Sequence, residues 1–135
     1  MNREKIREKT MQLIYQMEAE GTFDVTKLSI MEEDANIIGK KQADDTFDAI
    51  RDHIGDIDEL IKANLDKWSF ERISKTDLAI IRTAVAEIKY LYYIPQAVSI
   101  NEAVELSKKY SADNSYKFVN SVLGKIINNT EQVSE

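Results

Sequence analysis

Residues 95–125 read PQAVSINEAVELSKKYSADNSYKFVNSVLGK, and this stretch decides the fold. It contains the only proline of the chain and two runs of apolar residues at helical spacing, separated by the polar sequence SADNS. Pro95 disfavours helical backbone in the residue before it, so a preceding helix is expected to end there. Ser99 and Glu102 have the spacing of a capping box, which predicts the start of the next helix. The stretch therefore predicts two amphipathic helices joined by a polar turn.

Each of these two helices has a face that is expected to be buried. In the first helix that face comprises Ile100, Ala103, Val104, Leu106 and Tyr110. In the second helix, which Ser111 or Asp113 is expected to cap, it comprises Val119, Val122, Leu123 and Ile126. The opposite face of the second helix is polar, with Phe118 on the boundary, and it carries Asn114, Lys117, Ser121 and Lys125.

Helical periodicity also covers most of the preceding chain. It predicts helices over residues 3–20, 29–38, 41–65 and 76–92. Gly21 and Gly39 are expected to end or interrupt helices, and Gly55 is expected to bend or divide the third one. Ser74 stands three residues before Asp77, which predicts a helix cap. A short connection before it contains large apolar residues that are expected to plug the space between two sub-bundles, namely Trp68, Phe70 and Ile73.

The composition favours a single helical domain. A chain of 135 residues with 43% apolar residues is long enough for one compact core. Four glycines and one proline are too few for a turn-rich β-sandwich, so long helices are favoured. The chain has no cysteine, begins without an apolar signal segment, and contains no apolar run near the roughly 20 residues that a membrane span needs. We therefore expect a cytoplasmic protein that does not span a membrane.

No set of residues predicts catalysis or a metal site. The chain contains no glycine-rich phosphate loop and none of the motifs HExxH, GxSxG and CxxC. Its single histidine, His53, has no evident partner in the sequence and is expected at the surface. The neighbouring carboxylates are expected to form a solvated helix face, namely Asp44, Asp45, Asp48 and Asp52. The sequence therefore predicts a binding protein, not an enzyme, with no cofactor.

Charge is distributed unevenly along the chain. The net charge of −6 argues mildly against nucleic-acid binding. However, residues 18–59 carry thirteen acidic against four basic side chains, whereas residues 108–125 carry four lysines and one aspartate. The N-terminal segment is also rich in basic residues, with Arg3, Lys5, Arg7 and Lys9. Two basic segments therefore flank an acidic middle, and this distribution is more informative about binding partners than the net charge of the whole chain.

Short motifs along the whole chain carry a family resemblance. They are RE at residues 7–8, QLIY at 12–15, IDELI at 57–61, DLAIIRTAVAE at 77–87, INEAVELSK at 100–108 and KFVNSVL at 117–123. In this order they closely resemble NusB, a family of transcription antitermination factors. NusB-like chains also occur as the N-terminal domain of certain ribosomal RNA methyltransferases, but we expect this chain to be the stand-alone factor.

The resemblance implies an all-α fold of about seven helices, arranged in two small bundles packed roughly perpendicular to each other. The bundles are expected over residues 1–66 and 67–130 of a single domain, 1–135. It also implies binding to boxA, a short single-stranded element of ribosomal RNA leader transcripts, together with the ribosomal protein NusE. That pair joins an antitermination complex on RNA polymerase, which suppresses premature termination. Some family members associate with a second copy through the RNA face, so a homodimer stays open.

The resemblance further implies an RNA site made by the basic first helix and the loop that enters the last helix. Carried over by position, the RNA-binding residues are Arg3, Lys5, Arg7, Tyr15, Asn114, Lys117 and Phe118. Lysines neutralise phosphates and an edge aromatic can stack on an unpaired base, which fits this set. Asp77 and Glu87 are expected to contact the protein partner. Two plainer interpretations stay open, in which Lys117 is only solvated and Phe118 only packs in the core.

Glu4 and Glu8 dilute the positive charge of the first helix. We therefore expect weaker RNA binding by the chain alone and more dependence on NusE. An alternative function is a protein-only adaptor whose acidic middle binds a basic partner and which has little RNA affinity of its own.

Overall fold

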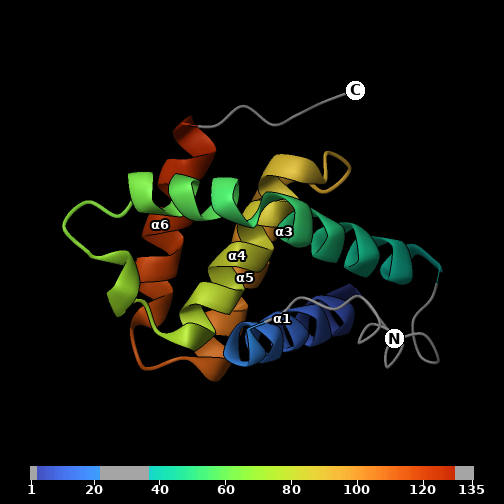
Figure 1. The fold of residues 1–135 in the computed structure, drawn as a ribbon, viewed down its shortest axis with the longest axis horizontal. Helices are drawn as coiled ribbons and strands as arrows, with labels where there is room; N and C mark the ends of the chain where they lie inside the picture. Colours follow the sequence, from blue (N-terminus) through green and yellow to red (C-terminus); the bar gives the residue numbers. More distant parts are fainter. Residues whose placement is uncertain (1–2, 22–36, 130–135) are drawn as a thin grey trace.

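The computed structural model of the chain is all-α, as expected, and is shown in Figure 1. It describes residues 3–21 and 37–129. The helices are α1 (Arg3–Glu20), α3 (Ile37–Ala63), α4 (Lys75–Tyr90), α5 (Gln96–Tyr110) and α6 (Ser115–Asn129), with a short 3₁₀ helix, η2 (Phe70–Arg72). Within these two ranges, no helix is both long and apolar enough to cross a membrane.

Helix α4 is the centre of the molecule. It packs against α1, α3, α5 and α6, and every residue from Asp77 to Ile88 is buried. It begins where the sequence predicts, because the Ser74 hydroxyl oxygen accepts the backbone N–H of Asp77 at 3.1 Å. The expectation of a central buried helix over this segment is confirmed, and the other helices are arranged around it (Figure 1).

One hydrophobic cluster runs through all five α-helices of residues 3–21 and 37–129. It joins Ile14 of α1, Ile57 of α3, Ile81 of α4, Leu106 of α5 and Ile126 of α6. A smaller cluster lies between α1 and α3 and contains Ile6, Leu13, Met17, Ala43 and Phe47. The whole apolar face expected for α6 is buried, which confirms that part of the pattern: Val119, Val122, Leu123 and Ile126.

The predicted capping box at the start of α5 is wrong. The helix begins at Gln96 directly after Pro95, so Ser99 already lies inside its first turn. The Ser99 hydroxyl donates to the buried carboxylate of Glu87 at 2.8 Å instead of receiving a backbone amide. The predicted cap is thus absent because α5 begins three residues earlier and the serine hydroxyl bonds to a buried carboxylate on α4.

Helix α3 differs from its prediction at both glycines. It runs through Gly39 and Gly55 without ending, and its break in helical geometry lies at His53, where φ is −129° and ψ is 23°. The His53 ring stacks on Tyr90 of α4, with centroids 4.3 Å apart and planes 9° from parallel. Most of the helix expected over residues 29–38 lies outside the described residues, so the number of helices in the whole chain stays a prediction.

Two buried arginines tie the helices together. Arg82 of α4, only 4% exposed, donates to both carboxylate oxygens of Asp58 on α3 at 2.9 and 2.8 Å and also to Glu18 on α1. Burial alone would lower the pKa of Arg82, but its hydrogen bonds to Asp58 and Glu18 outweigh this effect and raise the pKa above its ordinary value. Arg7 of α1 makes a similar pair with Glu87 of α4. These pairs fix the positions of α1 and α3 on the central helix.

Candidate nucleic-acid interface

The joint between α5 and α6 is held against the start of α4. The Ser111 hydroxyl, directly after α5, donates to the carboxylate of Asp77 at 2.6 Å. Asn114 has a left-handed backbone, with φ of 74°, a conformation that asparagine tolerates better than most residues. Its carbonyl oxygen accepts the N–H of Lys117 at 3.0 Å. The joint is thus a defined turn, and it leaves Asn114 and Lys117 exposed.

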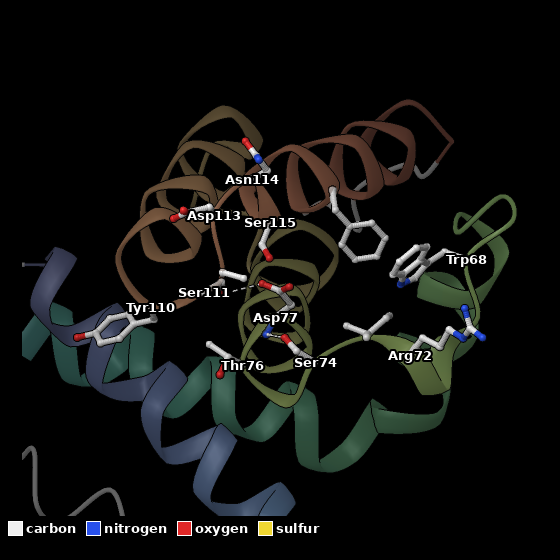
Figure 2. A pocket seen from close by; sticks show the side chains of 13 residues that line it. Trp68, Arg72, Ser74, Thr76, Asp77, Tyr110, Ser111, Asp113, Asn114 and Ser115 are labelled. Carbon is white, nitrogen blue, oxygen red and sulfur yellow. Dashed lines mark hydrogen bonds between the residues drawn. The ribbon is translucent and has the colours of Figure 1, made fainter.

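An open pocket of about 520 Å³, here called the joint pocket, lies between this turn and the connection before α4 (Figure 2). Two of the residues that line it, Trp68 and Phe118, are in contact, with ring centroids 5.7 Å apart and planes tilted by 49°. It is lined by Trp68, Arg72, Ile73, Ser74, Thr76, Asp77, Tyr110, Ser111, Ala112, Asp113, Asn114, Ser115 and Phe118.

Tyr110 connects the joint pocket to the face of α1. It also lines a second pocket of about 190 Å³, together with Met11, Gln12, Tyr15 and Thr76. Gln12 donates its side-chain N–H to the Tyr110 hydroxyl oxygen at 3.1 Å, and that hydroxyl donates to Glu8. Tyr15 is 40% exposed. The structure therefore brings Tyr15 to one continuous surface with Asn114 and Phe118, which lie in a distant part of the sequence.

The start of α1 carries mixed charge. Arg3 and Lys5 are exposed. A hollow of about 390 Å³ between α1 and α5 is lined by four glutamates and three lysines, in addition to Leu106. Lys109 donates to the Glu8 carboxylate at 2.8 Å, and this bond, with that from Tyr110, lowers the pKa of Glu8 below its ordinary value. Acidic side chains thus partly neutralise the basic segment, in the way that the sequence suggests.

Three of the predicted site residues are almost completely buried. Arg7 is only 5% exposed, and its guanidinium donates to both carboxylate oxygens of Glu87 at 2.7 and 3.0 Å. Glu87 is 1% exposed, and Asp77, at 6%, has its carboxylate bonded to Ser111. This burial argues against direct RNA contact by Arg7 and against partner contact by the two acids. Their positions indicate that they hold α1 and the joint in place.

Two aromatic residues on this surface were predicted elsewhere. Tyr110 was expected in the core but is 37% exposed, because α5 ends at Tyr110 and its hydroxyl reaches Glu8 on α1. Trp68 was expected as a plug but is 49% exposed, whereas its neighbour Ile73 is buried. Helical periodicity cannot place Trp68, since it lies in a non-helical connection.

Comparison with known proteins agrees with this geometry. The model of the NusB family matches residues 4–128. The chain belongs to the NusB family. Among characterised NusB proteins, the transcription antitermination protein NusB of Finegoldia magna is 38% identical over 138 aligned residues, which cover 99% of each chain. The transcription antitermination protein NusB of Clostridium novyi is 41% identical over 131 aligned residues, which cover 94% of this chain and 98% of that one.

Solved NusB structures share the fold. The structure described as T. maritima NusB superposes with a TM-score of 0.86 at 31% identity, covering 96% of this chain and 92% of that one. A crystal structure of the antitermination factors NusB and NusE in complex with dsRNA matches with a TM-score of 0.81 at 26% identity, covering 96% of this chain and all of that one. The described helices therefore have the arrangement found in the NusB family.

Proposed function

We propose that this chain is a transcription antitermination factor that binds boxA RNA of ribosomal RNA leader transcripts together with the ribosomal protein NusE. In this role it joins a complex on RNA polymerase and suppresses premature termination. It works by binding, without catalysis. Membership of the NusB family and the NusB–NusE–RNA complex solved for a relative support both partners.

The observation that carries the RNA assignment is the continuous surface formed by α1 and the α5–α6 joint. Tyr15, Tyr110 and Phe118 offer aromatic groups along it. The two basic segments contribute exposed cations, namely Arg3 and Lys5 from the first and Lys117 from the second. Aromatic groups stack on unpaired bases and cations neutralise phosphates, which together suit a single-stranded RNA.

The mixed charge of the α1–α5 hollow supports the expectation that RNA binding by this chain depends on NusE. Four glutamates lie among its three lysines, and an RNA phosphate approaching Lys109 also meets the Glu8 carboxylate at 2.8 Å from the lysine nitrogen. Repulsion of this kind weakens the electrostatic part of RNA binding. We therefore expect the chain alone to bind RNA weakly and the complex with NusE to bind it more tightly.

The test is a binding titration of labelled boxA RNA and a scrambled RNA, each with and without NusE. We expect boxA to bind more tightly than the scrambled RNA, and NusE to increase that preference. Lys117→Gln should weaken binding and reduce the steepness of the salt dependence by about 0.7 for the loss of one phosphate contact. Lys41→Gln, which removes an exposed lysine bonded to Asp45 on α3, is the control and should leave both unchanged.

Equal binding of both RNAs under all conditions, with NusE binding retained, would refute the RNA-binding role. That result would favour the protein-only adaptor.

A further inference from the structure

Trp68 is half exposed, although its side chain is the largest apolar one in the connection before α4. It is the only tryptophan of the chain, and its side chain is 49% exposed. The same connection buries Ile73 and packs Phe70 against the main hydrophobic cluster. The segment thus sends two of its three large apolar side chains inward and holds the indole outward. The exposed indole contacts Phe118, so the two rings form a joined aromatic patch and Trp68 is not an isolated surface residue.

The indole and the Phe118 ring both line the joint pocket. Their planes are tilted by 49°, with centroids 5.7 Å apart, so the two rings are in contact but not stacked flat. Figure 2 shows the Trp68 ring among the side chains that line the pocket, and Asp77 and Ser111 contribute polar groups to the same lining. Each ring therefore keeps aromatic surface that a flat group can cover.

The charges around the pocket favour an uncharged flat group inside it. Its lining contains the acids Asp77 and Asp113 and a single cation, Arg72, so a phosphate would gain little by entering. Arg72 is exposed beside Trp68 (Figure 2), and Lys117 is exposed next to Phe118 in sequence. This arrangement suits a nucleotide whose base enters the pocket while its phosphates lie near the exposed side chains of Arg72 and Lys117.

We propose that Trp68 is a base-stacking residue, and that Trp68 and Phe118 together hold one unpaired RNA base at the joint pocket. This inference rests on the proposed RNA-binding function and extends its surface from the joint to the connection before α4. Arg72 is part of this extended surface, where it contacts an RNA phosphate. The base has to be unpaired, because a paired base has both faces covered by its neighbours in the helix.

The fluorescence of Trp68 reports directly on this contact, since no other tryptophan contributes. Adding boxA RNA should quench the emission, and the affinity obtained from quenching should equal that from the anisotropy of labelled RNA. A fully paired duplex of the same sequence should leave the emission unchanged. With NusE present, the Trp68→Phe variant supplies the background signal of the partner.

Substitutions separate stacking from a structural role. Trp68→Ala should weaken boxA binding about 5- to 100-fold, the range expected for loss of one stacked base. Trp68→Phe keeps an aromatic face and should stay within about threefold of the original affinity. Tyr92→Ala removes another exposed aromatic, 63% exposed and outside both pockets, and should change nothing. Thermal unfolding of each variant checks that the fold is retained.

The outcomes distinguish this inference from the function on which it rests. RNA binding without quenching, with Trp68→Ala equal to Tyr92→Ala, overturns the stacking role and leaves the proposed function intact. Loss of NusE affinity in Trp68→Ala, with RNA affinity unchanged, assigns the indole to a protein contact and also overturns it. If no RNA binds to the unmodified chain with or without NusE, the proposed function and this inference both fail.

Discussion

The Arg7 guanidinium donates to both carboxylate oxygens of Glu87, and both side chains are almost completely buried. Removing one partner of such a pair leaves an uncompensated charge in the core, which typically costs about 3–5 kcal/mol. Arg7→Met should therefore lower the free energy of unfolding by about that amount. Arg3→Met, at an exposed position four residues earlier on α1, should change it by less than about 0.5 kcal/mol. Urea unfolding of both variants measures the difference.

The same pair allows a stricter test. The double variant Arg7→Met/Glu87→Met removes both charges and should recover much of the lost stability, because an apolar pair of similar volume can replace a buried ion pair. If Arg7→Met is no more damaging than Arg3→Met, the pair does not hold α1 on α4. Arg7 would then again be a candidate for direct RNA contact.

Glu8 gives the RNA-side surface a pH dependence. Hydrogen bonds from Lys109 and Tyr110 lower the folded-state pKa of Glu8 below its ordinary value of 4.5. The resulting stabilisation is present above pH 4.5 and is lost as the pH falls through the lowered pKa. Because Lys109 is 52% exposed, we expect the loss in Glu8→Gln at neutral pH to be less than about 1 kcal/mol.

Urea unfolding of Glu8→Gln and the original chain, at neutral pH and at about pH 3, checks this expectation. The gap between the two free energies should shrink as the pH falls toward and through the lowered pKa of Glu8, since protonation of the carboxylate removes its advantage over the amide. A gap that grows on acidification would contradict the assigned direction of the pKa shift. Glu105→Gln is the control, since that glutamate is 66% exposed and pairs only locally with Lys108.

At the scale of elements, helix caps are the clearest case of what sequence can and cannot predict. The Ser74 cap of α4 is local, because its acceptor and donor are three residues apart, and the structure has it as predicted. The box at Ser99 and Glu102 has the same spacing but is not formed. Its serine meets Glu87, twelve residues earlier in the chain, and no local pattern contains that contact. Local spacing therefore predicts a cap only where no tertiary partner competes.

Two serines provide a matched test of this argument. Ser74→Ala removes the hydroxyl that accepts the Asp77 amide and should destabilise the protein by about 1 kcal/mol. Ser69 precedes η2 but makes no side-chain capping hydrogen bond, so Ser69→Ala should cost less than about 0.5 kcal/mol. Thermal unfolding followed by circular dichroism compares the two. Equal losses would show that the hydroxyl of Ser74 contributes nothing specific to α4.

At the scale of the whole molecule, the sequence predicts the helices better than the surface they build. Helical periodicity and family motifs are sufficient for the all-α class, for the bounds of α1 and for the buried face of α6. The same reasoning placed Tyr110 and Trp68 in the interior and Arg7 on the RNA face. Each of those positions depends on a contact with another element: Glu8 for Tyr110, Phe118 for Trp68 and Glu87 for Arg7. Such pairings between distant segments are not encoded in local periodicity.

The division of the chain into bundles over residues 1–66 and 67–130 leads to a prediction about cooperativity. The main hydrophobic cluster crosses that boundary, because Ile57 of α3 and Ile81 of α4 belong to the same cluster as Ile126 of α6. Arg82 also bridges it through Asp58 and Glu18. Two bundles that share a core should unfold together, as small single domains usually do. We therefore expect a single transition in urea.

Trp68 fluorescence and far-ultraviolet circular dichroism supply two independent probes of that transition. The indole lies in the connection between the proposed bundles, whereas circular dichroism reports on all helices. Their midpoints should coincide, and Arg82→Met should shift both together because it weakens the contact between the halves without separating the shared core. Two separated transitions in the unmodified chain would show that the bundles are independent units. A separation seen only in Arg82→Met would instead identify the Asp58–Arg82–Glu18 contact as the feature that couples them.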